Sequence, residues 1–151
     1  MSVPPEKLHE LLRYCIDFAK VMLGDSGEFY PFGAVLRVDG EVKAVGGYDG
    51  KEHPKSGDIY RILFESSAEN VRDGSIAAAA LAANVYIPAE YSPPAPDGLR
   101  VHLESQNFAR FIYVPYRMAK QGMFKKRIRV EFLDPIPVQV QPSLFSDAAN
   151  A

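Results

Sequence analysis

The stretch that decides the fold reads FGAVLRVDGEVKAV and occupies residues 32–45. Its two apolar runs are separated by Asp39-Gly40, which is a strong hairpin signal because a type I′ turn needs positive φ at both central positions. We therefore predict antiparallel strands over 32–38 and 41–45. Alternate residues of the first strand should pack on the helices: Ala34, Leu36 and Val38.

A helix is predicted on each side of this hairpin. Apolar residues recur at helical spacing over residues 5–23, after Pro4-Pro5, and Gly24 is placed to end that helix. A second amphipathic helix begins at Ser56 or Asp58, either of which can cap it, and ends at Asp73-Gly74.

The segment 76–87 is ambiguous from sequence. Its alanines favour a helix, whereas its end, Val85-Tyr86-Ile87-Pro88, favours a strand. We predict a buried strand, because small side chains would let both helices pack closely on the sheet. A helix over 76–83 is the alternative.

Further strands follow a loop that is rich in proline. Leu99, Val101 and Leu103 alternate with Arg100, His102 and Glu104, which predicts a half-buried strand with His102 and Glu104 as a pair on its solvent side. Residues 111–114 are typical of a central strand, and alternation over 127–132 predicts a last one. The prolines at 135, 137 and 142 exclude regular central pairing after it.

The predicted order is therefore α-β-β-α-β-β-β. We expect one α+β domain over residues 1–145, with a mostly antiparallel sheet of about five strands and both helices packed on one face. Residues 146–151 are expected to form a disordered tail.

The composition of the chain disfavours several classes of function. The chain carries 17 basic and 19 acidic side chains, a balance that disfavours nucleic-acid binding. No apolar run is long enough to span a membrane, and no signal peptide is recognisable, so we expect a cytoplasmic protein. Its one cysteine, Cys15, lies on the apolar side of the first helix, which predicts a buried structural thiol.

Two short motifs carry resemblances. Residues 31–35, running into 39–42, resemble the first hairpin of the zinc-dependent nucleoside and tRNA deaminases, which hold zinc with a His or Cys beside a glutamate and a pair of cysteines. Here the second helix begins Ser56-Gly57-Asp58 and a second cysteine is missing, so we expect no metal and no cofactor. Residues 29–34, together with Val114-Pro115-Tyr116, resemble a group of small uncharacterised bacterial proteins, and this resemblance implies no activity.

Candidate site residues are few. Asp49, Glu52 and His53 lie in a polar loop and are candidates for general acid–base chemistry, although turns attract such residues for backbone reasons alone. The candidates for binding are a loop tyrosine, an acid at the second helix and two tyrosines of the central strand: Tyr48, Asp58, Tyr113 and Tyr116.

Two hypotheses of function follow. The first is a non-catalytic binding or protein-interaction module, such as an immunity protein that blocks a toxin; the second is a small enzyme that uses the loop 48–58. The basic run at 125–129 fits an acidic partner or the outer face of an edge strand, where charge discourages aggregation. We also expect a homo-oligomer, formed where a strand edge near the C-terminus pairs across a two-fold axis.

Overall fold

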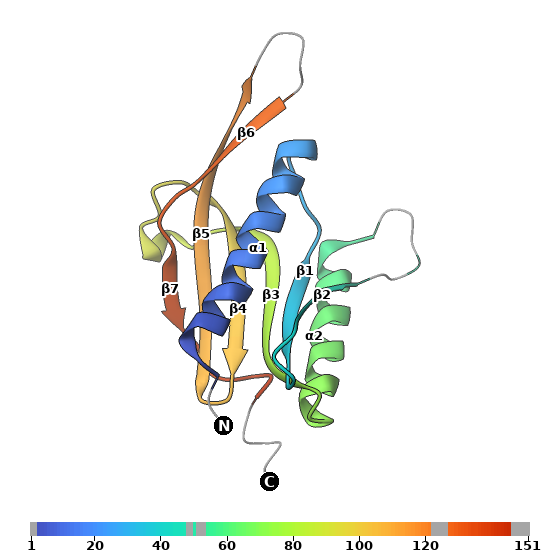
Figure 1. The fold of residues 1–151 in the computed structure, drawn as a ribbon. Coiled ribbons are helices and arrows are strands. Elements are labelled where there is room, and N and C mark those ends of the chain that lie inside the picture. Colours follow the sequence, from blue (N-terminus) through green and yellow to red (C-terminus); the bar gives the residue numbers. More distant parts are fainter. Residues whose placement is uncertain (1–2, 48–49, 51–53, 122–126, 146–151) are drawn as a thin grey trace.

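The computed structural model describes residues 3–47, 50, 54–121 and 127–145 (Figure 1). The helices in this part of the chain are α1 (Pro5–Ser26) and α2 (Ser56–Arg72), with a short 3-10 turn at Ala89–Tyr91. Its strands are β1 (Phe32–Arg37), β2 (Val42–Gly46), β3 (Ile76–Tyr86), β4 (Asp97–Ser105), β5 (Phe108–Gln121), β6 (Arg127–Phe132) and β7 (Ile136–Gln139). Neither helix is both long and apolar enough to cross a bilayer.

The strands form one antiparallel sheet in the order β2-β1-β3-β4-β5-β6, and β7 also pairs with β5. The predicted α+β class and antiparallel sheet are confirmed. The 76–87 segment is a strand, as predicted, and it occupies the centre of the sheet between β1 and β4. The sheet has seven strands rather than about five. The strand without a predicted counterpart is β7, which contains Pro137 and lies at the edge of the sheet.

The two helices lie on opposite faces of the sheet, so the prediction that they share one face was wrong. Ala78, Ala80 and Ala82 of β3 pack in the cluster that contains α1, whereas Ala79 and Leu81 pack in the cluster that contains α2. Successive side chains of a strand point to opposite faces, so the small residues of β3 let one helix approach from each side.

Helix α1 lies in the concave side of a curled sheet (Figure 1). It contacts β1 and β6, which are separated by three strands in the sheet order. Strands are spaced by about 4.8 Å, so a single helix about 10 Å wide reaches both only if the sheet bends around it. This bend leaves β6 beside α1, at the end of the sheet.

The β1–β2 turn differs from the predicted type I′ turn. Gly40 has φ 96°, but Asp39 is not among the residues with positive φ. The Gly40 N–H donates to Arg37 O and the Arg37 N–H donates to Glu41 O, which is the pattern of a three-residue loop that ends in a left-handed glycine. The longer loop takes Val38 out of the strand and leaves its side chain 68% exposed, so its predicted packing on the helices was also wrong.

Replacing Gly40 by Val should cost about 1 kcal/mol or more of unfolding free energy, because a β-branched residue is strained at positive φ. A Cβ at this position would meet no atom within 4 Å, so the cost is backbone strain and not a steric clash. Urea denaturation of wild type and variant measures it. An unchanged midpoint would contradict the left-handed conformation of Gly40.

Both predicted helix caps are corrected as well. Helix α1 continues past Gly24 to Ser26 and is capped by Gly27, which has φ 79° and donates its N–H to Leu23 O. Neither Ser56 nor Asp58 caps α2: the N-cap residue is Lys55, and it makes no side-chain capping bond. The glycine that takes the left-handed conformation, not the first glycine after the apolar stripe, sets the helix end.

Candidate functional site

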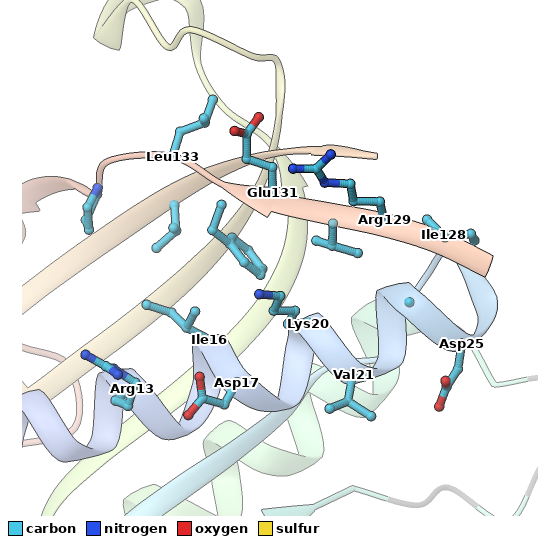
Figure 2. A pocket seen from close by; sticks show the side chains of 15 residues that line it. Arg13, Ile16, Asp17, Lys20, Val21, Asp25, Ile128, Arg129, Glu131 and Leu133 are labelled. Atoms are coloured by element: carbon cyan, nitrogen blue, oxygen red, sulfur yellow. The ribbon is translucent and has the colours of Figure 1, made fainter. Parts of the chain in front are cut away.

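An open groove runs between α1 and β6 (Figure 2). It has a volume of about 1020 Å³. Aliphatic and aromatic side chains from the helix and the sheet line it: Ile16, Val21, Val114, Ile128, Val130 and Phe132. Val21 is 59% exposed, so part of this apolar lining faces solvent.

The rim of the groove is charged, with both signs interleaved. Figure 2 shows Ile16 and Lys20 pointing from α1 toward β6, whereas Arg129 and Glu131 point from β6 away from the helix and so lie on the other face of that strand. Further charged residues of α1 line the groove: Arg13, Asp17 and Asp25. Neither Arg129 nor Glu131 forms one of the ion pairs found within 4.0 Å among the described residues.

Strand β6 adds a backbone edge to this groove. It pairs only with β5 in the part of the chain that the structure describes. The Leu133 N–H donates to Pro115 O over 2.8 Å, and the peptide groups of an antiparallel strand alternate in direction. The N–H and C=O groups of Val130 and Phe132 therefore point away from β5, toward the open edge.

A second polar feature lies on the α2 face of β4. His102 and Glu104 are both buried, and His102 Nε2 is 2.8 Å from Glu104 Oε1. The predicted surface pair is therefore a core pair. The ring of Phe64 on α2 stacks on His102, and the ring of Phe111 contacts it edge-on.

Glu104 also holds the C-terminal segment. Its carboxylate accepts the backbone N–H groups of Ser143, Leu144 and Phe145, at 2.6–3.2 Å. Burial alone would raise the pKa of Glu104, but the hydrogen bonds from His102, Phe145 and Ser143 outweigh it and hold the pKa below its usual value. Because these bonds use the carboxylate and Glu104 is inaccessible to solvent, we assign His102 and Glu104 a structural role.

Arg100, the third polar residue of this row, lies between aromatic rings. Its guanidinium carbon is 5.2 Å from the centre of the Tyr60 ring and 4.7 Å from that of Phe111. Its Nε is buried without a hydrogen-bond partner among the described residues. Cation–π contact stabilises an arginine in such a position, so this side chain joins α2 to the sheet.

The structure separates the predicted site residues. Tyr48, Asp49, Glu52 and His53 lie outside the described residues. Asp58 is on α2, 3.9 Å from the Arg61 guanidinium. Tyr113 is buried on the same sheet face as Arg100, whereas Tyr116 belongs to the α1 core and donates its hydroxyl hydrogen to Asn84 Oδ1.

Two further predictions concern thiols and metals. Cys15 is buried, and burial raises the pKa of its thiol to about 12, which suits the predicted structural role. Among the described residues, no three His, Cys, Asp or Glu side chains gather in a way that could hold a metal ion.

Sequence reasoning missed the groove altogether. The alternation of Ile128, Val130 and Phe132 indicated a strand, but it did not indicate that α1 would lie beside this strand.

Comparison with protein families, curated proteins and solved structures gives no match for the chain.

Proposed function

We propose that the chain is a non-catalytic protein-interaction module that binds its partner through the α1–β6 groove. The observation that carries this proposal is the combination of an apolar lining, charged residues of both signs along α1 and a strand edge that pairs with no other described strand, all in one place. Protein partners use such edges by adding a strand, whose backbone supplies affinity and whose alternate side chains supply specificity.

The lining supports a protein partner over a small molecule. Small-molecule sites enclose most of their ligand, whereas this groove is open to solvent. An apolar centre with a charged rim is the usual composition of a protein interface. A toxin-blocking protein of the immunity type is one form that such a module takes.

The alternative of a small enzyme rests on Asp49, Glu52 and His53, which lie outside the described residues. The described acid and histidine that do meet, Glu104 and His102, are buried beneath α2 and the C-terminal segment. We therefore propose binding as the principal function.

A Val21→Arg variant tests the proposal. Val21 lines the groove and is largely exposed, so a long cation there should fill the apolar lining without unfolding the helix. The wild-type protein and the variant are each immobilised and incubated with lysate of the cells that produce the wild-type protein. The variant should recover at least about tenfold less of the specific partner than wild type does. Quantitative mass spectrometry measures the recovery.

The matched control is Val38→Arg, which places the same charge on another exposed valine, at the tip of the β1–β2 hairpin. It should recover the partner as wild type does. Equal recovery by the two variants would exclude the groove as the binding surface.

A further inference from the structure

We infer that the partner of the β6 edge is the β6 strand of a second copy of this chain, so that two sheets join across a two-fold axis at Val130. This inference rests on the proposed function, because it names the occupant of the same edge. It follows from the direction of the free backbone groups and from the order of charges along the strand.

Only certain registers let two copies of β6 pair. The groups that point outward belong to alternate residues, including Val130 and Phe132. Two antiparallel copies must therefore align these residues with one another. For identical strands, the axis then passes through a single residue: Ile128, Arg129, Val130, Glu131 or Phe132.

These registers differ in which charged residues they place opposite each other. An axis at Ile128 aligns Arg127 of each copy with Arg129 of the other. An axis at Arg129 aligns Arg127 with Glu131 but places two arginines directly opposite each other, and an axis at Glu131 places two glutamates opposite each other. Like charges that face each other across a strand pair are destabilising. An axis at Phe132 gives neither Arg129 nor Glu131 an opposite charge, and it shortens the paired region.

An axis at Val130 instead places Arg129 of each copy opposite Glu131 of the other. Both side chains lie on the face of β6 that points away from α1 (Figure 2). On the opposite face, Ile128 of one copy meets Phe132 of the other beside the groove. This register forms two opposite-charge pairs, from side chains that form none of the ion pairs found within the described part of one chain.

The strand also has little to prevent such pairing. Edge strands are commonly protected by proline, by a bulge or by a run of like charge. Strand β6 contains no proline, its register with β5 is unbroken, and its three charged residues, Arg127, Arg129 and Glu131, include both signs. The opposite edge of the sheet, β2, is short and carries Lys43 as an exposed side chain.

Charge reversal tests this inference in the full chain. Sedimentation velocity should show wild type at twice the chain mass of 16.7 kDa. R129E and E131R each turn both cross-strand pairs into like-charge pairs, so each should raise the dimer dissociation constant by about tenfold or more. The double variant R129E/E131R restores opposite charges and should dimerise as wild type does.

A mixture of the two single variants gives the most specific test of the proposed register. The strand of R129E carries glutamates at positions 129 and 131 and that of E131R carries arginines at both, so an equimolar mixture should form a heterodimer. Its formation also shows that both variants are folded. R61E, which reverses an exposed charge on α2, is the matched control and should remain dimeric.

Several outcomes would overturn the inference: a monomeric wild type at high concentration, single variants that dimerise as wild type does, or a double variant and a mixture that remain monomeric. A monomeric wild type whose partner capture is still lost in Val21→Arg leaves the proposed function standing. The third possible result is that the charge variants change dimerisation as predicted, while Val21→Arg and Val38→Arg recover equal amounts of the partner from lysate. This result would support pairing of the two β6 edges and would exclude the groove as the binding site of a different protein.

Discussion

A Glu104→Ala variant is expected to lose about 3 to 5 kcal/mol of unfolding free energy. The substitution removes the acceptor of the N–H groups of Ser143, Leu144 and Phe145, and it leaves buried His102 without its partner. Unpaired donors in a buried site are costly, so the C-terminal segment should detach and expose Leu144, which is buried in the α2 core. Urea denaturation at pH 7 measures the loss.

The matched control is Glu65→Ala, which removes an exposed carboxylate on α2 whose only described ion pair is with Arg61. It should change the free energy by less than about 0.5 kcal/mol. A Glu104→Ala variant as stable as this control would mean that the carboxylate does not hold the C-terminal segment.

The pH dependence of stability supplies an independent check. The folded-state pKa of Glu104 lies below its usual value, so the folded protein binds this proton less tightly than the unfolded chain does. Its contribution is therefore complete above the unfolded pKa of about 4.3, and it is lost as the pH falls through the lower folded pKa. Glu104→Gln should lack this part of the acid destabilisation.

A Leu36→Ala variant is expected to lose about 2 to 5 kcal/mol, because truncation leaves a cavity in the α1 core. Leu36 is 4% exposed and lies in the cluster that includes Leu11 and Ala78. Val38→Ala, two positions along the chain, should be nearly neutral because Val38 has left the strand. Thermal melts of both variants test the register. A Leu36→Ala protein that melts as wild type does would place Leu36 outside the core.

Much of the fold could be predicted because local patterns encode it. Two apolar runs around Asp39-Gly40 indicate a hairpin, and the end of the 76–87 segment indicates a strand. The run of alanine and leucine in that segment is apolar at consecutive positions, which is typical of a strand buried on both faces. Read in this way, it also predicts a helix on each side of the sheet.

The burial of His102 and Glu104 could not be predicted in the same way. Alternation along β4 indicates only that one of its faces is more polar than the other. That polar face is covered by α2 and by residues 143–145, about 40 positions away in sequence. Contacts between segments so far apart in sequence produce no local sequence pattern that could predict them. The groove between α1 and β6 likewise arises from packing between distant segments.

Hydrogen exchange at the amides of Val130 and Phe132 tests the central claim most directly, since these N–H groups form the open edge of β6. Arg129 and Glu131 serve as internal references, because their amides point toward β5. The account predicts that, in concentrated wild-type protein, residue-resolved NMR finds Val130 and Phe132 protected nearly as well as the references. In R129E at the same concentration these two amides should exchange rapidly. Rapid exchange of both amides in wild type at every concentration, with or without the captured partner, would contradict it.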